Sequence, residues 1–221
     1  MPYYNGEVFL LFDFIKNERI NILLIIFIWL LIINVTNFID GIDLLSANYI
    51  ITFSVCVLIS SILKSDYFLM TISLSIPIFS LPFIYLNWHP SKLFFGDAGS
   101  IPFGLFAGWI IFILFFIDCW EIIVIGSLYF VLDIIITDIL KFIKKENIFE
   151  RHNDFLFHKK LLLGNSPLII NIKILFINFF LIIIGVISHI YNLGFYGVIL
   201  GIIIILTYYL YYELKIRKLE L

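Results

Sequence analysis

Long uncharged stretches alternate with short polar segments along this chain. Four of the uncharged stretches are Ile20–Ile39, Leu44–Leu63, Tyr67–Trp88 and Ala98–Ile117. Each holds about 20 residues, which is the length that an α-helix needs to cross the ~30 Å hydrocarbon core of a bilayer. We therefore predict a transmembrane helix in each of them.

Two further apolar stretches depart from this simple pattern. Ile122–Leu140 is interrupted by Asp133 and Asp138, and Asp133 has no sequence-local partner for its charge. Ile174–Tyr212 is nearly twice the length of one span and contains the turn signal His-Ile-Tyr-Asn-Leu-Gly, which indicates a hairpin of two spans. The whole pattern predicts an all-α, polytopic membrane helix bundle of about seven transmembrane helices, with residues 1–221 as a single membrane domain.

Composition agrees with this interpretation and excludes other classes. Hydrophobic residues make up 62% of the chain and its mean hydropathy is +1.11, which is outside the range of water-soluble globular proteins. The net charge of −2 argues against nucleic acid as a partner. The lipid bilayer is therefore the expected environment of this protein.

Three polar segments stand out between the predicted spans, at residues 34–43, 94–100 and 152–158. Two predicted spans separate each polar segment from the next, so all three fall on one face of the membrane. That face carries ten lysines and arginines against three on the opposite face. The positive-inside rule therefore predicts a multi-pass protein of the cell inner membrane, with the polar segments and the C-terminus in the cytoplasm.

The first polar segment contains two carboxylates and an amide at a regular spacing. Asn37, Asp40 and Asp43 follow one another at intervals of three, which would gather them on one helical face at the membrane surface. Such a group can hold a hard divalent cation or bond sugar hydroxyls. The alternative is a capped helix end, because Asp and Asn are favoured in caps and turns.

The second polar segment predicts a tight loop that opens the following span. Ser100 is expected to be the N-cap of that span, and Gly96 lies in the loop before it. The backbone N–H groups at such a helix start form a site for phosphate. Asp97 beside that site would need a counter-cation, which favours Mg²⁺, with Mn²⁺ as the alternative metal. A simple turn that contains an aspartate is the competing explanation.

The third polar segment combines histidines with basic residues. His152, Asp154, His158 and Lys159 suit a diphosphate and the charge that develops on it during transfer. The alternative is that the lysines of this region only set the orientation of the protein in the membrane.

In order and spacing, the three polar segments resemble the motifs of the bacterial polyprenyl-phosphate N-acetylhexosamine-1-phosphate transferases. Residues 34–43 resemble the Asn/Asp signature of that family, residues 94–100 its Phe-x-Gly-Asp-x-Gly-Ser loop, and residues 151–159 its histidine-bearing loop. The resemblance extends over roughly residues 6–212.

The resemblance implies a reaction. A polyprenyl phosphate would attack the β-phosphorus of a UDP-N-acetylhexosamine with Mg²⁺, which yields the lipid-diphosphate-sugar and UMP and initiates cell-envelope polysaccharide synthesis. Asp97 would be the metal ligand, and Asp40, Asp43 and His158 would join it as catalytic residues. The substrate-binding residues would be Asn37, Gly96, Ser100, His152, Asp154 and Lys159.

Two departures from the family pattern matter for activity. First, the family carries an Asp-Asp loop that does not occur before Ile20 in this chain, so several N-terminal spans are expected to be missing. Second, Phe155 and Phe157 stand where the family usually has histidines. The alternative function is therefore an inactive remnant, or a subunit that complements a separately encoded N-terminal half. The alternative partner is a second copy of the chain in a homodimer. A transporter fits less well, because the acidic groups cluster at one face. A CDP-alcohol phosphotransferase would require residues that do not follow Asp40.

Overall fold

The computed structural model describes residues 3–4, 7–8, 17–145, 160–161 and 163–217. A short antiparallel pair, β1 (Tyr3–Tyr4) and β2 (Glu7–Val8), precedes the helices. The helices are α1 (Glu18–Phe38), α2 (Leu45–Lys64), α3 (Tyr67–Leu86), α4 (Gly96–Phe116), α5 (Glu121–Gly126), α6 (Leu128–Lys144), α8 (Pro167–Ile190) and α9 (Gly194–Arg217).

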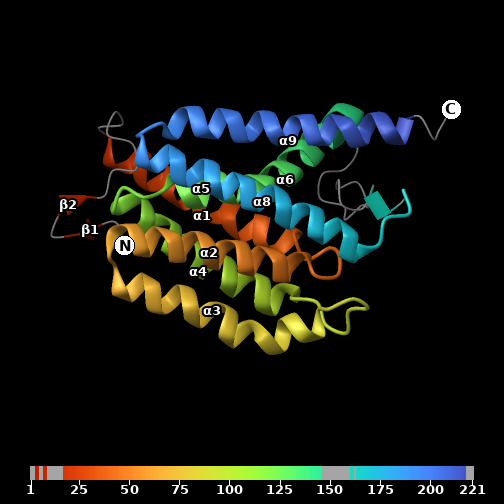
Figure 1. Ribbon diagram of the computed structural model, residues 1–221. Coiled ribbons are helices and arrows are strands. Elements are labelled where there is room, and N and C mark those ends of the chain that lie inside the picture. Colours follow the sequence, from red (N-terminus) through yellow and green to blue (C-terminus); the bar gives the residue numbers. More distant parts are fainter. Residues whose placement is uncertain (1–2, 5–6, 9–16, 146–159, 162, 218–221) are drawn as a thin grey trace.

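Six of these helices, α1, α2, α3, α4, α8 and α9, are long and apolar enough to cross a membrane. They run roughly along a common axis (Figure 1), as a bundle of transmembrane helices requires. The predicted hairpin is confirmed, because α8 and α9 are joined by a short turn at residues 191–193. The chain is thus a polytopic membrane helix bundle.

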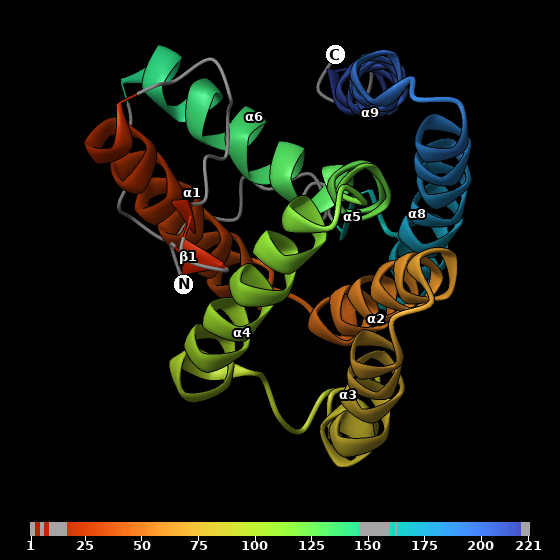
Figure 2. The same cartoon turned by 90° about the vertical axis from the view of Figure 1, so that its left-hand side faces the viewer.

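The predicted span over residues 122–140 is not one continuous helix. It is divided at Ser127 into α5, of six residues, and α6, of 17 residues. The hydroxyl of Ser127 donates a hydrogen bond to the backbone carbonyl of Ile123 at 2.6 Å, so the Ser127 side chain satisfies a carbonyl of α5 next to the break. Asp133, Thr137 and Lys141 follow at intervals of four on α6 and are all buried, so this helix has a polar side that a lipid-facing span lacks. Seen along the bundle axis, α6 diverges from α5 toward α1 (Figure 2).

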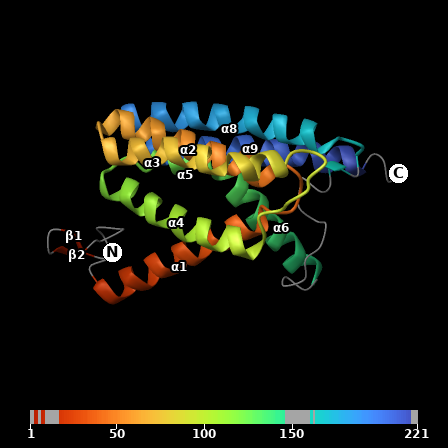
Figure 3. The same cartoon turned by 90° about the horizontal axis from the view of Figure 1, so that it is seen from below.

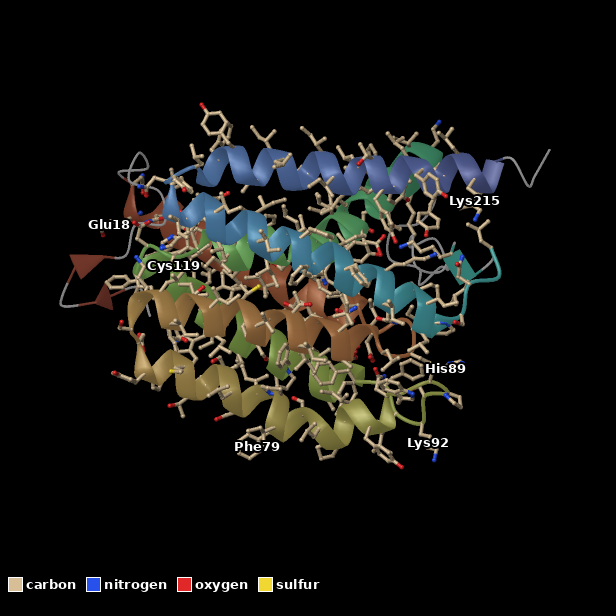
Figure 4. All side chains as sticks on the ribbon, in the orientation of Figure 1. Glu18, Phe79, His89, Lys92, Cys119 and Lys215 are labelled. Carbon is tan, nitrogen blue, oxygen red and sulfur yellow. The ribbon has the colours of Figure 1, made fainter. Side chains whose placement is uncertain are left out.

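The ends of the helices separate into two groups. Figure 4 shows Glu18 and Cys119 at one end of the bundle and His89, Lys92 and Lys215 at the other. The α1–α2 connection, the α3–α4 connection and the C-terminal end of α9 therefore share one end, as the counting of spans predicts. We call this the site end.

The centre of the bundle is built around α2, the most buried of the six long helices. Tyr49 and Phe53 of α2 pack edge to face against Phe103 of α4, and Tyr49 packs in the same way against Phe130 of α6. Aromatic contacts of this geometry add to the stabilisation from burial. They fix α4 and α6 relative to α2.

Helices α1 and α4 lie side by side away from α8 and α9 (Figures 2 and 3), and they make extensive contact. Glycines on α4 permit the approach: a Cβ at Gly104 would lie 2.8 Å from the Cα of Ile33, and one at Gly108 would collide with the ring of Trp29. The Trp29 indole Nε1 also donates to the carbonyl of Leu105 at 2.9 Å. Close packing at small residues is the usual way in which transmembrane helices associate.

We expect Gly104→Ala to destabilise the bundle by about 1–3 kcal/mol, because the added methyl group meets backbone and not a flexible side chain. The measurement is thermal unfolding in detergent. Leu105→Ala is the matched control, since Leu105 is adjacent on α4 and 55% exposed. Equal stability of the two variants would contradict the close helix contact.

Candidate functional site

The first two polar segments meet at the site end of the bundle. The loop over residues 39–44, which follows α1, lies against the loop over residues 87–95, which leads into α4. Figure 4 places His89 and Lys92 of the second loop at this end. Side chains from the end of α1 and the start of α4 therefore face one another across the two loops.

A direct contact joins two of the predicted site residues. The amide Nδ2 of Asn37, in the last turn of α1, donates to Oδ1 of Asp97 at 2.7 Å and lies 2.8 Å from Oγ of Ser100. Asp97 is exposed in the first turn of α4, whereas Ser100 is buried one turn further in. The Asn37 amide thus fixes the position of the Asp97 carboxylate.

Asp40 holds the start of α4 from a distant part of the chain. Its Oδ1 accepts hydrogen bonds from the backbone N–H of Phe95 at 2.9 Å and the hydroxyl of Ser46 at 2.7 Å. Its Oδ2 accepts from the backbone N–H of Gly96 at 2.7 Å. A carboxylate is stabilised at this position by the positive end of the helix dipole. Asp40 therefore caps α4 across 55 residues of sequence.

Two sequence-based expectations about local geometry are wrong. Asn37, Asp40 and Asp43 do not share a helical face, because α1 ends at Phe38 and the chain turns at once, with the N–H of Gly41 donating to the carbonyl of Ile39 at 2.7 Å. Ser100 is not an N-cap. Helix α4 begins four residues earlier, at Gly96, whose φ of +58° favours glycine.

The same residues line an open cavity. Asn37, Asp40, Gly96 and Asp97 surround a volume of about 320 Å³ at the site end. Its lining combines carboxylates, an amide and the exposed backbone of Gly96. Four of the predicted site residues thus converge on one polar cavity, and Ser100 supports it from beneath.

Asp43 lies apart from that lining and is paired with a residue that sequence reasoning missed. Its Oδ2 lies 2.7 Å from Nδ1 of His89 and accepts from the backbone N–H of Ser91 at 3.1 Å. The available signal was that His89 belongs to the same predicted membrane face as Asp43. Asp43 therefore holds the second loop at its beginning, as Asp40 holds it at its end.

Two buried asparagines fix the loop over residues 39–44. The backbone N–H of Leu44 donates to Oδ1 of Asn87 at 2.9 Å, and Nδ2 of Asn87 donates to the carbonyl of Leu93 at 3.0 Å. Asn171 of α8 donates through Nδ2 to the backbone carbonyl of Asp43 at 2.8 Å. Buried polar groups satisfied in this way make a loop rigid.

The third polar segment lies outside the described residues. His152, Asp154, His158 and Lys159 belong to it, so their predicted roles stay predictions.

The next residue after that segment, Lys160, is described and fully buried. Its Nζ lies 2.9 Å from the hydroxyl of Tyr208 and 4.3 Å from the centre of the same ring. Burial lowers the pKa of Lys160 to about 7; the charge of Asp133 opposes this shift and that of Lys173 adds to it. Asp133, which has no sequence-local partner, is linked to Lys160 through the hydroxyl of Tyr129, which lies 3.5 Å from Oδ2 of Asp133 and 3.4 Å from Nζ of Lys160.

The chain matches the profile of a known protein family. The profile of the family described as "Glycosyl transferase family 4" matches residues 5–115. The match includes both loops of the cavity and all four residues that line it.

Curated relatives give consistent similarities. The chain is 29% identical over 102 residues to a "Probable undecaprenyl-phosphate N-acetylglucosaminyl 1-phosphate transferase" of Bacillus subtilis, covering 46% of this chain and 27% of that protein. It is 36% identical over 76 residues to a "Phospho-N-acetylmuramoyl-pentapeptide-transferase" of Wolbachia, covering 34% of this chain and 23% of that protein. The matched part is thus about a quarter of each relative's length. No solved structure matches the chain.

Proposed function

Because the chain belongs to glycosyl transferase family 4, we propose that it transfers an N-acetylhexosamine 1-phosphate group from a UDP-sugar to a polyprenyl phosphate. In this reaction a phosphate oxygen of the lipid attacks the β-phosphorus of the UDP-sugar. The bond from that phosphorus to the oxygen of the α-phosphate breaks, UMP leaves, and a lipid-diphosphate-sugar remains. Both relatives are named as transferases of a phosphorylated sugar, which supports this class of reaction.

The observation that carries the proposal is the cavity at the site end. It brings Asn37, Asp40, Gly96 and Asp97 together beside the membrane-embedded helices. A reaction between a water-soluble nucleotide and a lipid phosphate needs a polar site at this boundary. We propose that the site end faces the cytoplasm of the cell inner membrane, where UDP-sugars are available.

The donor set of the cavity fits magnesium. Mg²⁺ in phosphoryl-transfer sites is bound by one or two carboxylates together with substrate phosphates and waters. Asp97 would hold it, with Asp40 at the same cavity, and the bound ion would neutralise charge on the diphosphate. The described residues contain no group of three or more His, Cys, Asp or Glu side chains able to hold a metal by themselves, so substrate oxygens would complete the coordination.

The chain's own residues would supply positioning, which is the main contribution of the protein in phosphoryl transfer. Asn37 fixes the Asp97 carboxylate, and Asp40 fixes the start of α4, where the diphosphate would bind. Asp43, through His89 and Ser91, would hold the second loop against the nucleotide-sugar. His152 and His158 would contact the diphosphate, and Asp154 and Lys159 would be further substrate-binding residues.

The test is an assay for UMP release from UDP-GlcNAc, UDP-GalNAc and related donors with undecaprenyl phosphate. It is run on the purified chain alone and on the chain co-expressed with the N-terminal spans of the Bacillus subtilis relative. We expect UMP release that needs both substrates and falls at least about 100-fold when EDTA removes Mg²⁺. The absence of UMP release from every donor in both preparations would overturn the proposal. That result would leave a non-catalytic role as the alternative.

A further inference from the structure

His89 is held by a carboxylate and is also open to solvent. Its Nδ1 lies 2.7 Å from Oδ2 of Asp43, and its side chain is 44% exposed. The same Oδ2 accepts from the backbone N–H of Ser91, and an ionised carboxylate oxygen can only accept. The proton of the neutral His89 ring is therefore on Nδ1, which leaves Nε2 as a hydrogen-bond acceptor.

Two acceptor atoms of this pair are left over. Within the part of the chain that the structure describes, no hydrogen bond reaches Nε2 of His89 or Oδ1 of Asp43. The Asp43 side chain is 18% exposed, and its Oδ1 does not belong to the buried atoms that lack a partner. Both side chains are thus open at the site end, so a ligand can approach the pair.

The pair lies close to the proposed diphosphate site. Asp43 follows Asp40, which lines the cavity, by three residues, so their Cα atoms are at most about 11 Å apart. The loop between them is fixed, since the backbone carbonyl of Asp43 accepts from Asn171 at 2.8 Å. A UDP-sugar with its diphosphate in the cavity extends beyond it with the uridine on one side and the hexosamine on the other. The pair is therefore near enough to contact one of these two ends.

On the basis of the proposed function, we infer that His89 binds the UDP-sugar directly, with its Nε2 and the Oδ1 of Asp43 accepting hydrogen bonds from sugar hydroxyl groups. Hydroxyl groups match an acceptor pair of this kind, whereas phosphate oxygens only accept and would be repelled by the carboxylate. Ribose and hexosamine both carry such hydroxyl groups. His89 would thus add to the affinity for the UDP-sugar and not only to the rigidity of the second loop.

The test compares His89→Asn with the unmodified chain. The amide nitrogen of asparagine lies where Nδ1 of histidine does, so the variant keeps the bond to Asp43 and lacks Nε2. Binding of UDP-GlcNAc and UDP-GalNAc is measured by calorimetry with Mg²⁺, in both preparations used for UMP release, together with thermal unfolding. We expect the Kd to rise about threefold to tenfold at an unchanged unfolding temperature. A role in loop rigidity alone predicts no change in either quantity.

The source of the hydroxyl group is identified with UMP and 2′,3′-dideoxy-UMP. If ribose is the partner, His89→Asn weakens binding of UMP and leaves that of the dideoxy analogue unchanged. If the hexosamine is the partner, the variant weakens binding of the UDP-sugar alone. Either result supports the inference, whereas equal weakening of UMP and its dideoxy analogue would overturn a contact with hydroxyl groups.

His189→Asn is the matched control. Nδ1 of His189 lies 2.9 Å from Oε2 of Glu121, close to Cys119 in the sequence and so at the opposite end of the bundle (Figure 4). This variant should bind the UDP-sugar normally. If His89→Asn does not fold, His89→Gln, whose amide reaches the place of Nε2, is compared with His89→Ala and should bind more tightly.

The outcomes that refute this inference differ from those that refute the proposed function. An unchanged Kd in His89→Asn, equal effects of the two His→Asn variants, or equal affinities of His89→Gln and His89→Ala would overturn the inference, even if UMP is released. So would the absence of UDP-sugar binding by the unmodified chain in both preparations. Weaker binding by His89→Asn without UMP release from any donor would instead refute the transfer reaction and leave the binding role in place.

Discussion

Asp97→Asn is expected to reduce UMP release by at least about 100- to 1000-fold in the active preparation, while the protein still inserts and folds. The substitution removes the negative charge and keeps the shape of the side chain. The carbonyl oxygen of an asparagine can still accept the hydrogen bond from Nδ2 of Asn37, so the contact between α1 and α4 remains. Initial rates of UMP release and thermal unfolding in detergent are measured together.

Asp118→Asn is the matched control for this prediction. Asp118 is also an exposed acid, but it follows α4 at the opposite end of the bundle and has a φ of +52°, which asparagine tolerates. We expect full activity from it. If Asp97→Asn kept normal activity, or failed to insert, the charge of Asp97 would not have the role proposed here.

Asp40→Ala is expected to lower both stability and activity. The variant loses the acceptor for the N–H groups of Phe95 and Gly96 and for the hydroxyl of Ser46. Hydrogen bonds to a charged group contribute about 1.5–3 kcal/mol each, and they are not additive, so a loss of about 3 kcal/mol is a reasonable magnitude. Because the start of α4 also carries Asp97, we expect UMP release to fall about 100-fold, even below the unfolding temperature.

Asp66→Ala separates this effect from the ordinary loss of a helix cap. Asp66 caps α3 through the N–H of Leu69 at 3.0 Å, at the end of the bundle opposite the site. Its removal should cost about 1 kcal/mol and leave the rate of UMP release unchanged. If the two variants lost activity equally, Asp40 would be only a structural cap.

Much of the architecture could be predicted from span lengths alone. The apolar stretches that form α1 to α4 are each long enough to cross a bilayer and are bounded by polar residues. The number of these helices, and which of their ends lie on the same face of the membrane, therefore follow from the sequence. The same counting predicted that Asn37 and Asp97 belong to one face. It could not predict that they touch, because that depends on how closely α1 and α4 approach.

The errors have local physical causes. Spacing alone cannot show where a helix stops. Helix α1 ends at Phe38, and the Asp40 carboxylate accepts hydrogen bonds from the backbone at the start of α4. The break at Ser127 was hidden because the residues around it are as apolar as those of a continuous span. His89 was missed because its partner, Asp43, is 46 residues away in the sequence.

The glycine at position 104 bears on how natural variants of this protein should be interpreted. Thr36, the neighbour of Asn37, lies against Gly104, where a Cβ would be 3.2 Å from the threonine Oγ1. An extra methyl group in this buried contact between α1 and α4 would therefore widen the gap between the two helices and draw the Asn37 amide away from the Asp97 carboxylate. A variant at this glycine would look conservative and does not touch the cavity itself, yet its phenotype would be that of a change to the residues that line the cavity at the site end.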